Sequence, residues 1–192
     1  RGFYNKETTM IKTIIADPPW NQTGGGKIKR GADRHYKLMK TDECIITVAD
    51  MLDSVEYENQ LAENLHFYLW VTNNQVPDGL ELFNKLGFTY KTNVCWVKDR
   101  FGIGYYFRGQ HELMLFGVRG NGARVKTGDN GIPSVIHAKR RKHSQKPAEF
   151  YDLVERRSEG DYLYLFSRQA PRDGWHMMGD EVGKMDEERL LF

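Results

Sequence analysis

The sequence predicts an α/β protein, in which a mixed, mostly parallel sheet is flanked by helices. Short apolar runs, rich in β-branched and aromatic residues, recur along the 192-residue chain and have the length of strands. Segments with apolar residues at helical spacing lie between several of these runs. Strands that alternate with helices in this way favour a sheet with parallel strands.

The first half of the chain contains two predicted strands and two predicted helices. Residues 11–16 form an apolar, β-branched run that predicts a buried strand, and 64–72 form a second one. Between them, 21–37 are rich in glycine and charge and predict a loop. A Thr-Asp-Glu start predicts a helix at 41–51, and the spacing of leucine and phenylalanine predicts another at 78–88, which a glycine ends.

The second half continues the pattern. Apolar runs at 89–98, 111–120 and 161–167 predict three more strands, and 175–182 predict a short sixth strand. The segment 147–158 predicts a helix, with a proline in its favoured first turn.

The composition is that of an ordinary globular protein, with 40% hydrophobic residues, 28% charged residues and a net charge of +2. No apolar run reaches the roughly eighteen residues that a membrane span needs, and the first residues lack the apolar core of a secretory signal. Cys44 and Cys95 lack metal-ligand spacing, so we expect reduced thiols and no metal site. We expect a flexible N-terminal tail (1–10), one domain (11–183) and an acidic C-terminal tail (184–192).

Asp17 follows the first predicted strand directly and is followed by Pro18, Pro19 and Trp20. Ligands of open α/β sheets gather beyond the carboxyl ends of the strands, so this position suits a site. The prolines stiffen the turn, and we expect their carbonyls to remain free as acceptors. The Asp17 carboxylate and the Pro18 carbonyl would then hold both hydrogens of an NH2 group and stabilise positive charge on its nitrogen, while Trp20 offers a face for stacking. The motif predicts recognition of a nucleobase amine; the alternative is a rigid turn with a packed tryptophan.

The segment ADPPW after an apolar strand resembles the signature of S-adenosylmethionine-dependent amino methyltransferases. The segments LHFYLWVTN, NVCWVKDRFGIGYYFRGQHELMLFGVRG and SQKPAEFYDLVERRSEGDYLYLFSR follow in the order seen in one family. That family contains the catalytic subunit of the eukaryotic messenger-RNA N6-adenosine methyltransferase and DNA-modifying relatives from bacteria and phages. The resemblance covers about residues 11–182. It implies a Rossmann-like methyltransferase fold, in which the catalytic segment precedes the cofactor segment.

The resemblance also implies roles for the residues that match. Asp17 and the Pro18 carbonyl would bind the adenine amine, Trp20 would shape the pocket and Pro19 would hold the turn. Together these four residues are the predicted catalytic set.

The cofactor implied by the resemblance is S-adenosyl-L-methionine. Lys146 would face its carboxylate, Arg168 would approach its ribose, and the turn after Gly179 would contact the ribose hydroxyls through Asp180 or Glu181, a choice that stays open because relatives carry Asn-Gln there. The predicted cofactor-binding residues are Ile15, Ala16, Asp17, Lys146, Phe166, Ser167, Arg168, Gly179, Asp180 and Glu181.

Two basic loops adjoin these motifs. One follows the acid-proline motif and the other directly precedes Lys146, which suits enzymes that must draw a base out of a helix or act on a single strand. The predicted nucleic-acid-binding residues are Lys27, Lys29, Arg30, Arg34, His35, Tyr36, Arg108, Lys139, Arg140, Arg141, Lys142 and His143.

A third stretch, 98–108, interleaves Lys98, Arg100 and Arg108 with aromatic residues. It can be a nucleic-acid surface or a subunit contact, and the corresponding loop of the eukaryotic relatives resembles the latter. For His111-Glu112 we expect a hydrogen-bonded structural role, because the methylated amine can lose its proton to water or Asp17.

We therefore expect an enzyme that methylates the N6 amine of adenine in nucleic acid, with DNA favoured over RNA. The alternatives are an RNA N6-adenosine methyltransferase, a DNA cytosine N4-methyltransferase and a non-catalytic nucleic-acid-binding subunit. The expected partners are nucleic acid and either a second copy or a related methyltransferase subunit, with no membrane. We expect a cytoplasmic location in a prokaryotic or phage-infected cell, or a nuclear one in a eukaryote.

Overall fold

The computed structural model describes residues 10–21, 38–58, 60–102, 106–121, 125–126, 128–141, 145–168 and 172–179. Within these residues seven strands form one sheet, in the order β5-β3-β4-β2-β1-β6-β7. β4 runs antiparallel to both of its neighbours, and the other pairs are parallel. The strands are β1 (Ile11–Ala16), β2 (Leu61–Val71), β3 (Thr89–Val97), β4 (His111–Arg119), β5 (Val135–His137), β6 (Tyr162–Leu165) and β7 (Trp175–Met178).

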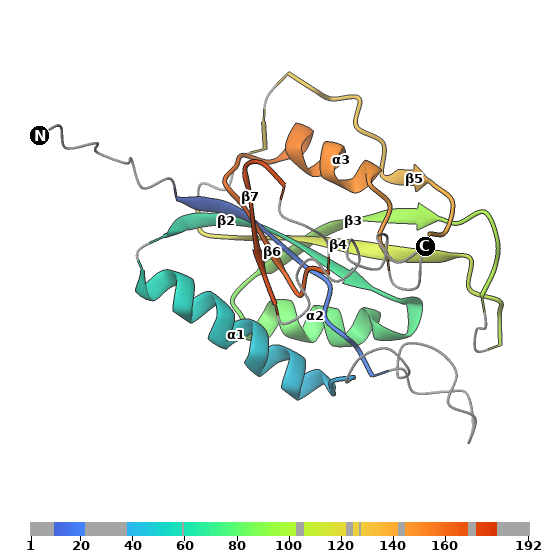
Figure 1. Ribbon diagram of the computed structural model, residues 1–192, viewed down its shortest axis with the longest axis horizontal. Coiled ribbons are helices and arrows are strands. Elements are labelled where there is room, and N and C mark those ends of the chain that lie inside the picture. The colour runs from blue at the N-terminus through green and yellow to red at the C-terminus, as the bar shows by residue number, and fades with distance from the viewer. Residues whose placement is uncertain are drawn as a thin grey trace, which may run out of the picture.

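The described part of the chain holds three α-helices, α1 (Thr41–Tyr57), α2 (Val76–Lys85) and α3 (Glu149–Arg157), and a short 3-10 helix, η2 (Asn73–Gln75). α1 and α2 cover one face of the sheet and α3 covers the other (Figure 1). The predicted mixed, mostly parallel sheet flanked by helices is therefore confirmed. No helix among the described residues is both long and apolar enough to span a bilayer.

The core has two layers, one on each face of the sheet. Because side chains alternate along a strand, β2 supplies both layers. Phe67 and Leu69 pack in the layer under α1 and α2, whereas Tyr68 and Trp70 pack in the layer under α3.

Glycine at position 79 lets α2 approach the sheet. A Cβ there would stand 2.8 Å from Val71 Cγ1 and 2.9 Å from Leu115 Cδ1. The end of α2 agrees with the prediction, because Gly87 has φ 73° and its N–H donates to the Asn84 carbonyl. With the neighbouring bond from Phe88 to the Phe83 carbonyl, this is a Schellman motif.

α1 begins at Thr41, as predicted, but Thr41 does not cap it. Glu43 accepts a hydrogen bond from the Lys40 N–H at 2.8 Å, so Lys40 is the N-cap. The Thr41 hydroxyl donates instead to the Asp78 carboxylate at the start of α2, at 2.6 Å. α3 begins at Glu149 rather than at the proline two residues earlier, and α1 runs six residues further than predicted.

β5 was not predicted. It has three residues, of which Ile136 alone is buried, so it carries no apolar run of strand length. It forms because Val97, at the end of β3, pairs with His137 of β5. Only the position of this segment beside β3 makes it a strand.

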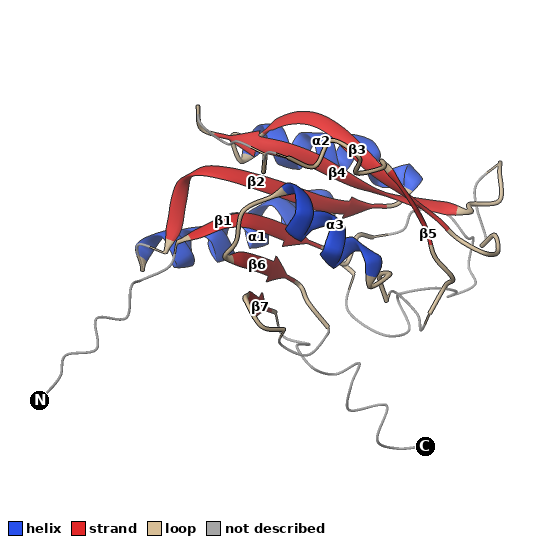
Figure 2. Ribbon diagram, turned by 90° about the horizontal axis from the view of Figure 1, so that it is seen from above, coloured by secondary structure: helices blue, strands red, loops and turns tan. Residues whose placement is uncertain are grey.

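The strands bring distant segments to one edge of the sheet, where the arrowheads of β1, β2 and β6 point the same way (Figure 2). Ala16, the last residue of β1, pairs with Leu165, the last of β6. Because β4 is antiparallel, its beginning lies at this same edge: Leu113 pairs with Val71, and the first residue of β4 faces the last of β3. The predicted site at the carboxyl end of β1 therefore has β2, β3, β4 and β6 as its neighbours.

Candidate active site

Four charged side chains meet at this edge and form what we call the charged cluster: Asp17, Lys98, Glu112 and Lys146. Lys146 Nζ lies 2.8 Å from Asp17 Oδ2 and 3.4 Å from Glu112 Oε2. Lys98 Nζ lies 2.5 Å from Glu112 Oε1 on its other side. The two carboxylates and two ammonium groups alternate, so each charge is compensated locally.

Tryptophan rings line the cluster. Lys146 Nζ lies 5.5 Å from the centre of the Trp70 ring, and Lys98 Nζ lies 4.6 Å from that of Trp96. The two rings meet edge to face at 6.3 Å. The Lys146 side chain is only 7% exposed, whereas that of Asp17 keeps 20% of its surface exposed. Asp17 is therefore the member of this pair that a bound molecule can reach more readily.

The two carboxyl groups have opposite pKa shifts. Burial raises the pKa of Asp17, and the attraction of Lys146 offsets this only in part. Burial acts on Glu112 too, but Lys146 and Lys98 together outweigh it and lower the pKa of Glu112. Glu112 is thus the firmly ionised partner of two lysines, and Asp17 is the carboxylate that takes a proton more easily.

The expectation that the proline carbonyls remain free is wrong. The Pro18 carbonyl accepts the N–H of Trp20 at 2.8 Å, and the Pro19 carbonyl accepts the N–H of Met39 at 2.8 Å. These bonds close the turn and tie it to the segment before α1. A carbonyl oxygen has two lone pairs, so Pro18 keeps capacity for one further donor.

Trp20 does not offer an open face for stacking. The indole is buried, and its Nε1 donates to the Trp70 carbonyl at 2.9 Å. Trp20 therefore fixes the turn to the end of β2, as the alternative of a rigid turn with a packed tryptophan expects. Packing of Trp20 does not exclude a site, because Asp17, three residues earlier, contacts Lys146 instead.

Apart from Lys146, which precedes α3, the predicted cofactor residues that are described lie on or directly after β1, β6 and β7. Ile15 and Ala16 are fully buried in the two core layers, so only their backbone can face a ligand. Phe166 has φ 59°, and a Cβ on Gly179 would stand 3.1 Å from the Phe166 Cα. The ends of β6 and β7 are thus in contact, and a side chain at position 179 would separate them.

Ser167 is buried, and Arg168 is close enough to Asp17 to lower its pKa, as a minor contribution. The structure therefore brings Arg168, Asp17 and Lys146 together, although they are far apart in the sequence. Asp180 and Glu181 lie outside the described residues, so their predicted role stays a prediction.

Of the predicted nucleic-acid-binding residues, Arg108, Lys139, Arg140 and Arg141 are described, and all are exposed. The others lie outside the described residues: Lys27, Lys29, Arg30, Arg34, His35, Tyr36, Lys142 and His143.

Glu112 and Lys98 belong to the site, and sequence reasoning missed them. Glu112 is hydrogen-bonded, as expected, and its partner is Lys98; it also forms an ion pair with Lys146, the lysine that holds Asp17. The sequence does contain a usable signal. Glu112 is the second residue of the predicted strand 111–120, and Lys98 is the last residue of the predicted strand 89–98, so an acid and a base come together if these strands pair as a hairpin. Only the pairing of β3 with β4 makes that signal visible.

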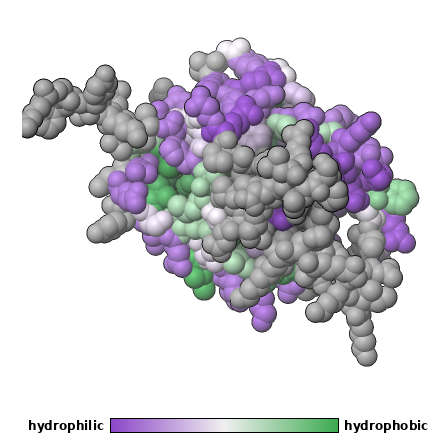
Figure 3. Space-filling model, viewed as in Figure 1, coloured by the Kyte–Doolittle hydropathy of each residue, from purple (hydrophilic) through white to green (hydrophobic). Residues whose placement is uncertain are grey.

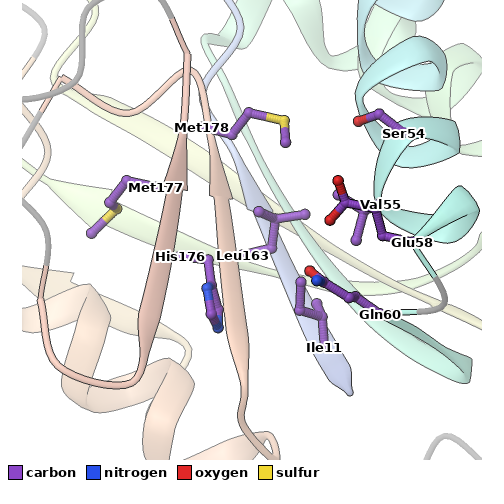
Figure 4. Close-up of a pocket in the computed structure, with 9 residues that line it drawn as sticks. All are labelled: Ile11, Ser54, Val55, Glu58, Gln60, Leu163, His176, Met177 and Met178. Atoms are coloured by element: carbon purple, nitrogen blue, oxygen red, sulfur yellow. The ribbon is translucent and has the colours of Figure 1, made fainter. Parts of the chain in front are cut away.

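A pocket of about 170 Å³ lies elsewhere, between α1 and β7 (Figure 4). Ile11, the first residue of β1, lines it together with Leu163 and Gln60. Asp17 stands beyond the other end of β1, roughly 20 Å away along the strand. The pocket is therefore separate from the charged cluster. Among the described residues, no three His, Cys, Asp or Glu side chains gather as metal ligands would.

Comparison with known proteins identifies the family. A sequence profile of the MT-A70 family matches residues 11–181. The catalytic subunit METTL3 of the Homo sapiens N(6)-adenosine-methyltransferase is 29% identical over 181 residues, which cover 88% of this chain and 28% of that protein. The METTL3 subunit of Danio rerio is 30% identical over 181 residues, with 88% and 27% covered.

A bacterial protein matches over more of its own length. The type II methyltransferase M.MunI of Mycoplasma sp is 24% identical over 182 residues, which cover 89% of this chain and 77% of M.MunI. The chain thus spans about a quarter of the length of the eukaryotic relatives it matches. Since the profile match runs from β1 to beyond β7 and includes the whole charged cluster, the chain belongs to the MT-A70 family.

Proposed function

We propose that this protein is an S-adenosylmethionine-dependent methyltransferase of Rossmann-like fold that methylates the N6 amine of adenine in nucleic acid. The observation that carries the proposal is the position of Asp17, which follows β1 at the sheet edge, stays 20% exposed and is held by the buried Lys146. Within this proposal DNA is the expected substrate rather than RNA, and the assay below tests both nucleic acids.

Asp17 would recognise the amine. Its carboxylate oxygens accept hydrogen bonds, and the second lone pair of the Pro18 carbonyl can accept the other amine hydrogen. Positive charge that develops on the nitrogen during transfer would be stabilised by the Asp17 carboxylate. For this to happen, Lys146 must share Asp17 with the substrate, and its second partner Glu112 keeps it bound meanwhile.

The raised pKa of Asp17 suits a second task. An amine that gains a methyl group must lose a proton, and a carboxylate whose pKa is raised by burial accepts a proton more readily than a solvated aspartate. Water can take the same proton, so this contribution is a modest part of the rate.

The described residues suit the cofactor in charge and shape. Lys146 is a cation that can turn towards a carboxylate, and Arg168 and Ser167 supply hydrogen-bond donors beside it. The absence of a side chain at Gly179 keeps the ends of β6 and β7 close. When bound, S-adenosylmethionine supplies a methyl group activated by a positively charged sulfur.

The test compares Asp17→Ala and Asp17→Asn with the wild type, using adenine-containing DNA and RNA oligonucleotides and labelled methyl donor. Both variants should lose at least about a hundredfold in methyl transfer, the loss typical of removing one group that stabilises developing charge. Calorimetry measures S-adenosylmethionine binding in each variant, which separates a loss of transfer from a loss of the cofactor that Asp17 is also predicted to contact. Asp50→Asn, an exposed acid on α1, is the matched control and should keep full activity.

Mass spectrometry of the product nucleosides distinguishes the alternatives. N6-methyladenine supports the proposal, and N4-methylcytosine shows the other amine to be the substrate. A wild type that binds nucleic acid but transfers no methyl group is a binding subunit. Normal turnover by Asp17→Ala would refute the role of this residue.

A further inference from the structure

A second surface of the chain combines exposed aromatic rings with basic side chains, close to the charged cluster but not part of it. It comprises Arg100, Phe101, Tyr106, Phe107 and Arg108 at the end of the β3–β4 hairpin and Lys139, Arg140 and Arg141 after β5. We call these eight residues the aromatic–basic surface.

The rings are unusually open to solvent. Tyr106 is 97% exposed, Phe107 86% and Phe101 65%. Figure 3 has the same view as Figure 1, in which the β3–β4 hairpin projects on the right. At that side of Figure 3 a hydrophobic group stands out among hydrophilic side chains. Large aromatic rings that gather at one end of a hairpin, and not scattered singly, indicate an interaction site.

The two segments are joined, so they present one surface. The hairpin arms continue beyond the strands through the bond from the Gly102 N–H to the Gly109 carbonyl, at 2.7 Å. The Arg140 N–H donates to the Asp99 carboxylate at 2.9 Å, and Arg140 Nη1 would lie 3.9 Å from a Cβ placed on Gly102. The Trp96 indole donates to the Ala138 carbonyl at 2.9 Å, which holds the base of the second segment.

Both segments lead directly into the charged cluster. Arg108 stands four residues before Glu112, and Arg141 stands five residues before Lys146. A molecule bound along the aromatic–basic surface would therefore extend towards Asp17.

The charges decide what kind of partner fits. Among the described residues 98–102, 106–110 and 138–141, Asp99 is the only acid, and it already lies beside Arg100 and accepts the Arg140 N–H. Five exposed basic side chains remain around the rings. A second copy docked by a two-fold axis would place like charges together, which is unfavourable. A polyanion with flat bases matches both the charge and the rings.

We propose that the aromatic–basic surface binds unpaired nucleotides that flank the target base, with the rings stacking on bases and the basic side chains contacting phosphates. This proposal rests on the proposed function, because it takes the substrate to be nucleic acid. It deepens that function by assigning the enzyme a preference for single-stranded or locally opened substrate.

The test is fluorescence anisotropy with labelled oligothymidine, a probe that contains no adenine and so does not depend on the base pocket. Tyr106→Ala with Phe107→Ala should weaken binding by roughly tenfold or more, since one stacked base contributes about that factor. Arg100→Ala with Arg108→Ala should weaken binding and reduce its dependence on salt concentration. Tyr90→Ala with Lys91→Ala, exposed at the opposite end of β3, is the matched control and should bind as the wild type does.

A parallel measurement with duplex DNA tests whether the aromatic rings stack on bases. The aromatic pair of substitutions should weaken single-strand binding much more than duplex binding, because the bases of a duplex are already stacked. An equal effect on both, or no effect on either, would overturn the proposal. Sedimentation velocity adds a further outcome: a dimer that dissociates in the aromatic variant, with oligothymidine binding unchanged, would show that the surface is a subunit contact.

The two proposals can fail separately. If the wild type methylates oligonucleotides but the surface variants bind oligothymidine normally, this inference fails and the proposed function stands. If the wild type transfers no methyl group but the surface variants lose binding, the proposed function fails and the surface stands.

Discussion

Each charge in the cluster at the sheet edge depends on another. Lys146 holds Asp17 and Glu112 together, and Lys98 binds Glu112 from the far side. Removing one carboxylate therefore leaves two lysines to compete for the other. Because of this coupling, a substitution of Glu112 should change the stability of the protein as well as its activity.

Glu112→Gln should lower the free energy of unfolding by about 2 kcal/mol at neutral pH, the range for hydrogen bonds to a charged group. The pKa of Glu112 is lowered from 4.5 in the folded protein, so its stabilising contribution is complete above about pH 4.5 and is lost as the pH falls through the folded value. The difference between wild type and variant should therefore shrink in acid. Urea unfolding at several pH values measures it, with the exposed Glu81→Gln as control. A difference that stays constant down to strong acid would contradict the ionised role of Glu112.

A buried hydroxyl offers a second prediction at the scale of the residue. Ser158 Oγ lies 2.7 Å from His66 Nδ1 and 2.6 Å from the Tyr68 hydroxyl, between β2 and the end of α3. Ser158→Ala removes the atom that both contact, and should lower the free energy of unfolding by about 2 kcal/mol. Ser54→Ala, whose hydroxyl is exposed on α1, should change it by less than about 0.5 kcal/mol. Equal thermal stability of the two variants would show that the buried contacts contribute little.

At the scale of the single element, the close approach of α2 to the sheet limits the size of the side chain that its buried face can carry. α2 carries a glycine at its buried position 79, where alanine would improve helix propensity by about 1 kcal/mol. Here the added methyl would meet Val71 and Leu115 below 3 Å. For alanine at position 79, helix propensity therefore favours stability, whereas packing against the sheet opposes it.

Gly79→Ala should destabilise the protein by about 1–3 kcal/mol, the usual range for overpacking a core. Asn84→Ala, on the exposed face of the same helix, gains propensity without a clash and should stabilise it by a few tenths of a kcal/mol. Urea unfolding compares the two. A stabilised Gly79→Ala protein would mean that α2 can move away from the sheet.

At the scale of the whole molecule, one sheet separates two apolar layers that share its strands. Phe83 is buried in the layer under α1 and α2, and Phe150 is buried in the layer under α3. Since β2 contributes side chains to both layers, loss of either layer should destabilise the same sheet. The molecule should therefore unfold as one cooperative unit.

Phe83→Ala and Phe150→Ala should each lower the free energy of unfolding by about 3–5 kcal/mol. Circular dichroism and tryptophan fluorescence should give coincident transitions in both variants. Phe107→Ala, which removes an exposed ring, should leave stability unchanged. Two separated transitions in either core variant would show that the layers unfold independently.

Several features of the fold and site follow from local sequence alone. The limits of β1, the glycine end of α2 and the place of Asp17 just after a strand are confirmed, because side-chain alternation, turn residues and proline stiffness act between near neighbours. The expectation that Trp20 presents an open face for stacking was wrong, since the face that an indole presents depends on what packs against it. The three-residue β5 was invisible for the same reason.

Local sequence patterns are enough to predict the α/β class, six of the seven strands in their order and the acid at the end of the first strand. The tertiary fold is needed to bring Lys98 and Glu112 to Asp17 and Lys146, to shift the pKa values of the two carboxyl groups in opposite directions, and to place the hairpin beside the segment after β5. These facts depend on β4 pairing between β2 and β3, a contact between residues far apart in the chain. Periodicity cannot reveal such pairing, because it is chosen by the packing of the whole sheet.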